Sequence, residues 1–302
     1  MKKNIFLSLV LGAFIAASCS KEETQPAPFI PIEPETPENT LPAPGEAKSI
    51  VVAHRGGSAE AGKTSFPDNS IASLRYAMSI GCYASELDVY WTKDDQIVVA
   101  HADSECRING MHPWQYTLEE LRNGGKLSNG ETLPSLEEYL EVVMEEGSCT
   151  KLWLDLKNIT YPKQMSDEVI AACRRSCEIV KEMKADNFVE FICTGNATVY
   201  SASKLIAAEY GIPIGWMANR SASDYASNAN MWANLSTEYF VSPIGSGDRT
   251  IEEFADKNVA ISIYNADTAT QMRYFVERRS MMKAICTNYP KQLITLIQAQ
   301  GN

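Results

Sequence analysis

The feature that most constrains the fold is a regular alternation between two kinds of segment over residues 49–302. Short runs rich in β-branched and aromatic residues are followed by longer stretches with the periodicity of an amphipathic helix. Repeated strand–helix units of this kind predict a parallel sheet with right-handed crossovers. Because about 250 residues of such units are typical of one barrel, we predict an α/β fold, a (β/α)8 TIM barrel.

The boundaries of the predicted elements follow from turn residues and helix caps. The predicted strands lie at 49–54, 84–90, 97–101, 152–156, 188–193, 213–217, 239–241, 259–264 and 284–287. The predicted helices lie at 70–80, 135–146, 166–184, 199–210, 251–257, 268–278 and 291–300. Ser135 followed by Glu138 predicts a capping box at the start of one of these helices.

One connection breaks the alternation. The strand at 84–90 is followed after only six residues by the next strand, and this spacing is too short for a parallel crossover. We therefore predict an antiparallel hairpin at residues 84–101, with its turn near Asp94 and Asp95. Pairing about that turn places His101 opposite Asp88. Eight other strands remain for the barrel.

The first residues have the anatomy of an export signal. Lys2 and Lys3 precede an apolar stretch at 5–17, which is too short for a stable membrane helix and ends in small residues. A cysteine, Cys19, follows at once. We predict a lipoprotein signal peptide at 1–18 and a lipidated Cys19 as the mature N-terminus, with ordinary secretion as the alternative.

Residues 19–48 form a predicted linker. Seven of the fourteen prolines fall within residues 20–48, interleaved with glutamates, and this composition favours an extended polyproline II chain that cannot bury a core. The predicted organisation is thus a signal peptide, a lipidated Pro/Glu-rich linker and a barrel domain at 49–302. We expect it in the bacterial cell envelope, lipid-anchored to the outer membrane and either periplasmic or surface-exposed.

Charge limits the partners of the chain. The formal net charge is −11 and the isoelectric point is near 4.9. Such a surface repels a polyanion, so we predict no nucleic-acid partner. The predicted contacts are a small-molecule substrate and a membrane reached through the lipid anchor, and the oligomeric state stays open.

Histidines and carboxylates gather at predicted strand ends. His54 and His101 are two of the three histidines and both end predicted strands. In a barrel, polar residues at the carboxyl ends of strands face the active site. Glu86 and Asp88 are two positions apart on one strand, so their side chains point to the same face.

Asp155 and Lys157 repeat this two-residue spacing at the end of another predicted strand. Three carboxylates converging from strand ends form a hard-oxygen site suited to Mg²⁺ or Ca²⁺. Arg55 and Lys157 would place positive charge around a phosphate. Together with the two histidines, this set favours phosphodiester cleavage.

Each of these residues also has a purely structural interpretation. His54 could be a hydrogen-bonded structural histidine. Glu86 and Asp88 could belong to a solvated strand face, and Asp155 and Lys157 could simply pair with each other. Their joint placement at strand ends favours the functional interpretation.

Eight segments in order resemble the glycerophosphodiester phosphodiesterase family, which belongs to the phosphatidylinositol-phospholipase-C-like TIM-barrel phosphodiesterases. They are His-Arg-Gly-Gly at 54–57, Asp-Asn-Ser at 68–70, Glu-Leu-Asp-Val at 86–89, Thr-Lys-Asp-Asp at 92–95, Val-Val-Ala-His at 98–101, Leu-Pro-Ser-Leu-Glu-Glu at 133–138, Asp-Leu-Lys at 155–157 and Ile-Cys-Thr-Asn-Tyr-Pro at 285–290. The resemblance covers roughly residues 49–302.

The resemblance implies metal-dependent hydrolysis of glycerophosphodiesters to glycerol 3-phosphate and an alcohol. It implies His54 and His101 as the acid–base pair, with the division of roles open. The other implied roles are one divalent cation, Mg²⁺ or Ca²⁺, on Glu86, Asp88 and Asp155, and phosphate binding by Arg55 and Lys157.

The chain departs from the family pattern at four positions. The family usually has Glu where this chain has Asp68 and Asp155, and Asp where it has Ala102 and Asn288. The Asp-Leu-Lys segment at 155–157 is instead similar to the related sphingomyelinase D branch.

Two other functions stay open. One is sphingomyelinase D- or phospholipase D-like cleavage of intact phospholipids or lysophospholipids, which requires an exposed apolar rim beside the site. The other is a non-catalytic barrel that binds a ligand.

Disulfide pairing also stays open. Beyond Cys19 an odd number of cysteines remains, and export permits disulfides. Cys82 and Cys106 flank the predicted hairpin and could approach each other.

Overall fold

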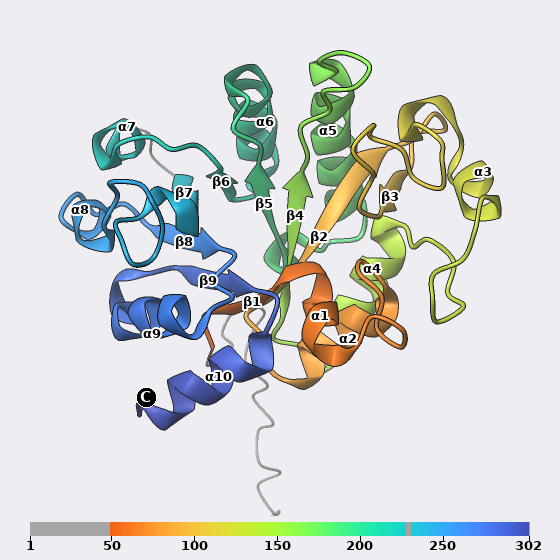
Figure 1. The fold of residues 1–302 in the computed structure, drawn as a ribbon. Coiled ribbons are helices and arrows are strands. Elements are labelled where there is room, and N and C mark those ends of the chain that lie inside the picture. The colour runs from red at the N-terminus through yellow and green to blue at the C-terminus, as the bar shows by residue number, and fades with distance from the viewer. Residues whose placement is uncertain (1–48, 228–230, 302) are drawn as a thin grey trace, which may run out of the picture. The chain divides into compact units, whose positions relative to one another are not determined.

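A computed structural model describes residues 49–227 and 231–301 of the chain (Figure 1). The predicted signal peptide at 1–18, the lipidation site Cys19 and the predicted linker at 19–48 lie outside the described residues. Within the described ranges, no helix is both long and apolar enough to cross a membrane.

Parallel strands close into a barrel at the centre of the described domain (Figure 1). Strand β1 pairs with both β2 and β9, which closes the order β1-β2-β4-β5-β6-β7-β8-β9. The strands are β1 (Val51–Ala53), β2 (Ala84–Trp91), β3 (Ile97–Val99), β4 (Lys151–Leu156), β5 (Val189–Cys193), β6 (Ile214–Trp216), β7 (Met231–Ser236), β8 (Ile261–Tyr264) and β9 (Ala284–Thr287). The predicted (β/α)8 barrel is confirmed.

Helices cover the outside of the barrel between successive strands (Figure 1). They are α1 (Ser58–Ala61), α2 (Ile71–Ser79), α3 (Leu118–Asn123), α4 (Leu136–Val143), α5 (Ser166–Glu182), α6 (Ala197–Tyr210), α7 (Ala222–Ala226), α8 (Ile251–Ala255), α9 (Ala269–Glu277) and α10 (Pro290–Ala299). All the predicted helices are present, and α1, α3 and α7 are additional short ones. The predicted capping box is also confirmed, since the side chains of Ser135 and Glu138 accept hydrogen bonds from each other's backbone N–H groups.

One predicted strand is wrong. Residues 239–241 are not a strand, because a 3-10 turn at Thr237–Tyr239 occupies the start of this segment. The seventh barrel strand is β7, which pairs in parallel with β6 and β8. Its sequence, Met-Trp-Ala-Asn-Leu-Ser, follows a Ser/Asn-rich stretch and lacks the β-branched residues found in most of the other strands. Its neighbours in the sheet, rather than its own composition, make it a strand.

The predicted hairpin is present, but its register differs by one residue. Strand β3 pairs antiparallel with β2, and Val99 lies opposite Val89. The backbone N–H of Ala100 donates to the carbonyl of Asp88 at 3.1 Å. Ala100 therefore takes the place predicted for His101, and the predicted pairing of His101 with Asp88 is wrong.

The hairpin turn explains this shift. The N–H of Thr92 donates to the carbonyl of Gln96 at 2.9 Å, and the N–H of Gln96 donates to the hydroxyl of Thr92 at 3.0 Å. These bonds centre the turn on Asp94 rather than between Asp94 and Asp95. A turn centred on a residue instead of on a bond moves the register by one position.

Alternate residues on the strands separate the barrel interior from its outer face. Two large apolar clusters lie between the strands and the helices, and a small one fills the middle of the barrel. The interior cluster consists of Val52, Ala84, Trp153, Ile192, Trp232, Ala284 and Cys286. The same alternation directs the next inward positions, Glu86 and Asp155 among them, to the carboxyl end of the barrel.

The predicted approach of Cys82 and Cys106 is wrong. Both are free, and they pack in different apolar clusters. Strand β3 ends at Val99 and the chain then turns between Asp103 and Arg107, so Cys106 does not continue along β2 toward Cys82.

Candidate active site

A left-handed turn after β1 positions two predicted site residues, His54 and Arg55. Arg55 has φ +49° and Gly56 has φ +80°. A Cβ at Gly56 would lie 2.4 Å from the Ser73 hydroxyl of α2, so glycine is needed both for its conformation and for the close packing. The turn directs the N–H of Arg55 to Glu86 Oε2 at 2.9 Å.

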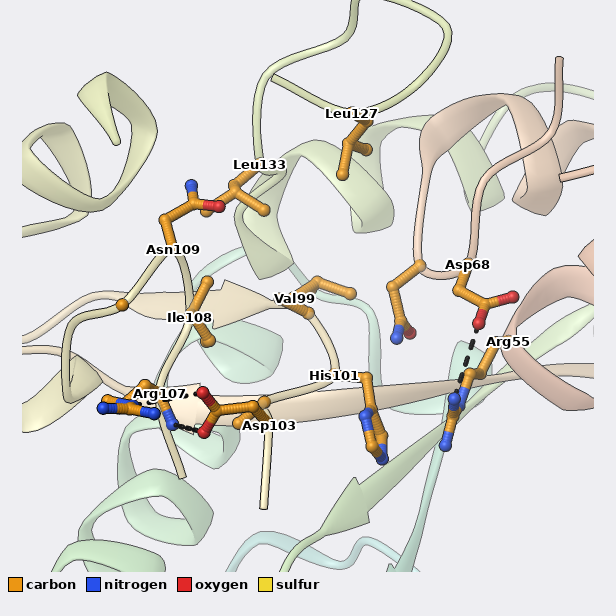
Figure 2. A pocket seen from close by; sticks show the side chains of 14 residues that line it. Arg55, Asp68, Val99, His101, Asp103, Arg107, Ile108, Asn109, Leu127 and Leu133 are labelled. Carbon is orange, nitrogen blue, oxygen red and sulfur yellow. Dashed lines mark hydrogen bonds and ion pairs between the residues drawn. The ribbon is translucent and has the colours of Figure 1, made fainter. Parts of the chain in front are cut away.

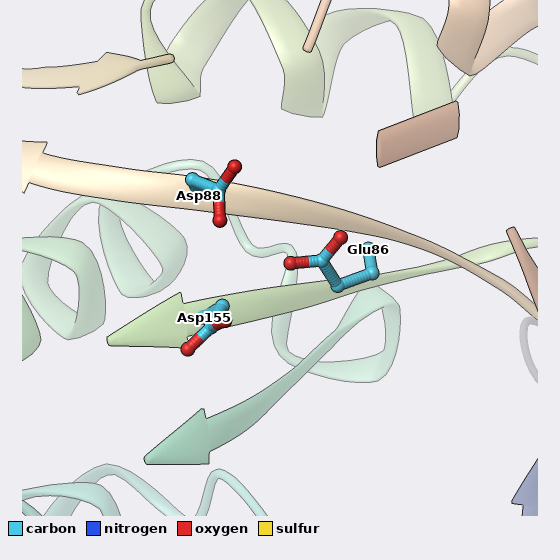
Figure 3. Close-up of side chains that lie close together, drawn as sticks. All are labelled: Glu86, Asp88 and Asp155. Atoms are coloured by element: carbon cyan, nitrogen blue, oxygen red, sulfur yellow. The ribbon is translucent and has the colours of Figure 1, made fainter. Parts of the chain in front are cut away.

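Three carboxylates converge at the carboxyl ends of two neighbouring strands (Figure 3). Glu86 and Asp88 lie on β2, and Asp155 lies beside Asp88 on β4 in the strand register. One oxygen from each can be chosen so that all three lie within 4.8 Å of one another. All three residues are buried, so the interpretation of Glu86 and Asp88 as a solvated strand face is wrong.

The carboxylates have the properties of a cation site. In the described part of the chain, Glu86 Oε1 and Asp155 Oδ1 have no hydrogen-bond partner although both atoms are buried. Burial and the charge of Asp88 raise the pKa of Glu86 to about 8, and burial raises the pKa of Asp155. A hard divalent cation would supply the missing contacts and charge, so the triad fits such a cation.

Two basic side chains border the carboxylates. The ammonium of Lys157 contacts Asp155 and lies 2.7 Å from Asp88 Oδ1, and Arg55 Nε lies 3.2 Å from Asp88 Oδ2. Burial alone would raise the pKa of Asp88, but Lys157 and Arg55 outweigh it and lower that pKa. Lys157 thus pairs with Asp155, as the structural alternative predicted, but it also joins that residue to Asp88.

An asparagine fixes the carboxylate of Asp88. The Nδ2 of Asn69 donates to Asp88 Oδ2 at 2.8 Å, and Asn69 Oδ1 accepts from the Asp88 N–H at 3.1 Å. The neighbouring Asp68 accepts from the hydroxyl of Ser58 and lies 3.4 Å from Arg55 Nη1. The Asp-Asn-Ser segment therefore orients both Asp88 and Arg55.

His54 belongs to a hydrogen-bond chain that the sequence did not reveal. Its Nδ1 lies 2.8 Å from Asn288 Oδ1, and Asn288 Nδ2 donates to Asp267 Oδ2 at 2.7 Å. Because the amide nitrogen is used by Asp267, the amide oxygen must accept from a protonated Nδ1. In the neutral imidazole the Nε2 is therefore the free acceptor, and it lies 3.8 Å from Glu86 Oε2.

Asp267 escaped sequence reasoning because it lies three residues beyond β8 and outside any segment of the resemblance. The sequence signal that could have identified Asp267 is its position shortly after a predicted barrel strand. Burial lowers the pKa of His54, which keeps its imidazole neutral at neutral pH.

Two cavities meet at Arg55. The outer cavity, of about 440 Å³, is lined by Arg55, Asp68, His101, Ala102 and Arg107 among others (Figure 2). The inner cavity, of about 220 Å³, is lined by Arg55, His54, Glu86, Asp155, Trp153 and Tyr264 among others. The structure thus gathers His54, Arg55 and Lys157 around the three predicted carboxylates. It places His101 in the outer cavity, which Arg55 also lines.

Comparisons with known proteins match one family. A model of the glycerophosphoryl diester phosphodiesterase family matches residues 54–292. A glycerophosphodiester phosphodiesterase from Caldanaerobacter subterraneus subsp. tengcongensis is 28% identical over 162 residues. The matched part covers 51% of this chain and 60% of that relative.

Solved structures share the barrel. A glycerophosphodiester phosphodiesterase from Parabacteroides distasonis matches with a TM-score of 0.68 and 24% identity, over 84% of this chain and 98% of that one. A phosphodiesterase from Oleispira antarctica, solved in complex with the product sn-glycerol-3-phosphate, matches with a TM-score of 0.60 and 20% identity. That match covers 85% of this chain and 97% of the other. At these identities the likeness establishes the fold.

Proposed function

The chain belongs to the glycerophosphoryl diester phosphodiesterase family, and from this premise we propose that it hydrolyses glycerophosphodiesters to glycerol 3-phosphate and an alcohol, with one divalent cation. The observation that carries this proposal is the buried triad of Glu86, Asp88 and Asp155 beside Arg55 and His54. The solved Oleispira antarctica relative holds sn-glycerol-3-phosphate as its product, which supports this class of substrate.

The basic and acidic groups have complementary tasks. A divalent cation on the triad would neutralise charge that develops on the phosphate. Arg55 reaches both cavities, so its guanidinium can hold a phosphate placed between them. Lys157 adds a second positive charge beside the carboxylates.

We assign His54 as the base and His101 as the acid. The hydrogen bond to Asn288 leaves Nε2 of a neutral His54 free to take a proton from the attacking hydroxyl. His101 lines the larger cavity, where its imidazolium can give a proton to the departing alkoxide. Burial lowers the pKa of His101, so the negative charge of the bound phosphate must favour this charged form. After one turnover His54 carries the proton of the nucleophile and His101 has lost one, and proton exchange with solvent returns both histidines to their starting states.

The two other functions have less support. In the described residues the exposed large hydrophobic side chains are Tyr116, Tyr161 and Leu205, and Leu205 lies on the outer helix α6. So few exposed apolar side chains in the described residues offer little of the apolar rim that cleavage of intact lipids requires. The complete set of two histidines and three carboxylates argues against a non-catalytic barrel.

Activity with matched variants tests the proposal. The full chain should release glycerol 3-phosphate from glycerophosphocholine or glycerophosphoethanolamine with Mg²⁺ or Ca²⁺, and EDTA should abolish the release. His54→Ala and His101→Ala should each lower kcat by about 10²- to 10⁴-fold, as for the loss of a general acid or base. His112→Ala is the control, because His112 stacks on Trp114, lines neither cavity and should retain activity. A folded protein that releases no glycerol 3-phosphate from any head group would refute the proposal.

We further propose that Cys19 carries a lipid and that residues 20–48 tether the barrel to the cell envelope. The support is the signal anatomy before Cys19 and the proline-rich composition after it. Cys19→Ser should move the protein from the membrane fraction to the soluble fraction. Unchanged membrane association of that variant would contradict the anchor.

A further inference from the structure

The cysteines of the barrel have no part in the proposed reaction. In the described residues seven cysteines carry free thiols, of which six are buried and one, Cys149, is only partly buried. An oxidant in solvent therefore reaches Cys149 more readily than the other six. A thiol that lies beside Cys149 is then the one that can form a disulfide with it.

Cys149 lies beside Cys82 at the start of two neighbouring strands. The first pair in the parallel ladder of β2 and β4 is Ala84 with Lys151. Each cysteine precedes its member of this pair by two residues. The strand register therefore places Cys82 and Cys149 next to each other.

Hydrogen bonds hold the two chains together as far as the cysteines. The N–H of Lys151 donates to the carbonyl of Tyr83 at 2.8 Å, and the hydroxyl of Thr150 donates to the carbonyl of Cys82 at 2.9 Å. Neighbouring chains in a sheet lie about 4.8 Å apart. A disulfide joins Cα atoms that are about 4.4–6.8 Å apart, so the backbone spacing at Cys82 and Cys149 suits this bond.

The other five cysteines are placed less well for pairing. Cys173 and Cys177 lie four residues apart on α5. Cβ atoms with this helical spacing are about 5–6 Å apart, whereas a disulfide needs about 3.5–4.5 Å. The thiol of Cys173 instead donates to the carbonyl of Ser203 at 3.7 Å. The remaining three are buried in separate parts of the fold, namely the loop after β3 (Cys106), β5 (Cys193) and β9 (Cys286).

We propose that Cys82 and Cys149 form a disulfide that ties the start of β2 to the start of β4. These two strands carry the three carboxylates of the candidate active site. The bond closes a loop that contains the hairpin and His101, and it stabilises the barrel by restricting this segment in the unfolded chain. The cell envelope proposed for this protein is an oxidising compartment in which such a bond persists.

The bond forms by thiol–disulfide exchange with a small disulfide such as oxidised glutathione. The Cys149 thiolate attacks one sulfur of the oxidant and expels a glutathione thiolate, and the Cys82 thiolate then attacks Cys149 Sγ and expels the second. The two cysteines lose two protons and two electrons, and the two glutathione sulfurs gain them. Burial and the nearby charges of Glu60 and Cys149 raise the pKa of the Cys82 thiol, so this exchange proceeds more readily while the barrel is folding.

Oxidative refolding of the full chain tests the disulfide. Cys19→Ser is used throughout, so that the seven barrel cysteines are the only thiols present. After refolding in a glutathione redox buffer, free thiols are alkylated and the peptides are mapped by mass spectrometry without reduction. The expected product is one linked pair of peptides that contains Cys82 and Cys149. Reduction of this protein should lower its Tm by about 5–15 °C.

Two serine variants form a matched pair. Cys149→Ser should fold because Cys149 is only partly buried. It should abolish both the linked peptides and the difference in Tm between oxidised and reduced protein. Cys106→Ser is the control, because Cys106 packs in the other apolar cluster from Cys82 and should retain both.

The possible outcomes decide the proposal without measuring turnover. Complete alkylation of Cys82 and Cys149 after oxidative refolding overturns the disulfide, as does a link between other cysteines such as Cys173 and Cys193. A dimer joined through Cys149 overturns it too. Because neither peptide mapping nor Tm depends on hydrolysis, failure of the disulfide leaves the proposed phosphodiesterase function standing, and the reverse also holds.

Discussion

Among the individual residues, Asn288 shows how a departure from the family pattern is accommodated. An aspartate at this position would be an acceptor for His54 but would face the carboxylate of Asp267. The amide instead accepts from His54 with its oxygen and donates to Asp267 with its nitrogen. Asp267 also accepts from the Asn288 N–H at 2.8 Å and from the hydroxyl of Thr287 at 2.9 Å. Asn288 is therefore a positioning residue that sets one tautomer of His54.

Removing this amide should alter the pH profile in a defined direction. Burial lowers the pKa of His54, whereas the hydrogen bond to Asn288 raises it. Asn288→Ala should therefore move the acid limb of kcat/KM to lower pH, since His54 must be neutral to act as a base. The plateau should fall by about 10- to 100-fold because the imidazole loses its orienting partner. A pH–rate profile measures both changes, and an acid limb that moves to higher pH would contradict the assignment.

The carboxylate triad predicts a proton-linked affinity for the cation. With its pKa raised to about 8, Glu86 holds a proton at neutral pH until a cation displaces it. Affinity for Mg²⁺ or Ca²⁺ should therefore rise as the pH increases from 6 to about 8 and then level off. Calorimetry in buffers of different ionisation enthalpy should detect the released proton at pH 7. Glu86→Gln removes the titrating group, so both the proton release and the rise should diminish.

Among the elements, the turn that follows β1 explains the His-Arg-Gly-Gly segment. Gly56 and Gly57 have φ of +80° and +77°, and each packs closely against another element. Gly56 lies against Ser73 of α2, and Gly57 lies against Pro290 at the start of α10. The two glycines therefore let the turn approach both helices while it presents His54 to the site.

Substitution of Gly56 should cost more stability than substitution of a glycine with a similar backbone but open space. Gly56→Ala combines a left-handed conformation with a Cβ 2.4 Å from the Ser73 hydroxyl, and we expect a loss of about 3 kcal/mol or more. Gly81 has φ +74° with no neighbouring atom within 4 Å, so Gly81→Ala should cost about 1–2 kcal/mol. Urea unfolding measures both values. Equal losses would show that the contact with Ser73 is unimportant.

At the scale of the whole barrel, a buried charge network ties together strands from different parts of the sheet. Glu190 on β5 accepts from Lys151 of β4 at 3.0 Å and lies 3.0 Å from Lys283, which precedes β9. The hydroxyl of Tyr83 and the indole N–H of Trp153 donate to the same carboxylate, each at 2.9 Å. One carboxylate therefore joins β4, β5 and the approach to β9, and Trp153 lies between Glu190 and Glu86 in the strand register.

Loss of this carboxylate should destabilise the barrel strongly. Glu190→Gln leaves two lysines without their counter-charge, and breaking a buried pair in this way typically costs about 3–5 kcal/mol. Burial would raise the pKa of Glu190, but Lys283 and Lys151 outweigh it and lower that pKa. The carboxylate thus stabilises the fold above its unfolded pKa, and this contribution is lost as the pH falls through the folded value.

The matched control for Glu190 lies on the surface. Glu145 pairs with Arg75, and both side chains are about half exposed. Glu145→Gln should cost less than about 1 kcal/mol, because solvent screens such a pair. Chemical denaturation at neutral pH compares the two variants. Similar losses would contradict the role of Glu190 in holding the barrel together.

The sequence alone determined the fold class and the residues of the carboxylate site. Alternation with a period of two marks inward positions, so Glu86 and Asp88 were placed on one face from their spacing alone. Short turns and helix caps also depend only on residues that are close along the chain. The hairpin at 84–101 and the capping box at Ser135 could be predicted for that reason. These features depend on hydrogen bonds and steric preferences between residues that are close along the chain.

Tertiary structure alone decided the features that depend on distant partners. The seventh strand is held by β6 and β8 rather than by its own composition, and the hairpin register depends on where one turn is centred. The chain from His54 through Asn288 to Asp267 arises where separate strands end side by side, and Cys149 lies beside Cys82 where two strands begin. Strand pairing brings these groups together across long stretches of chain, and no local preference encodes which atoms then meet.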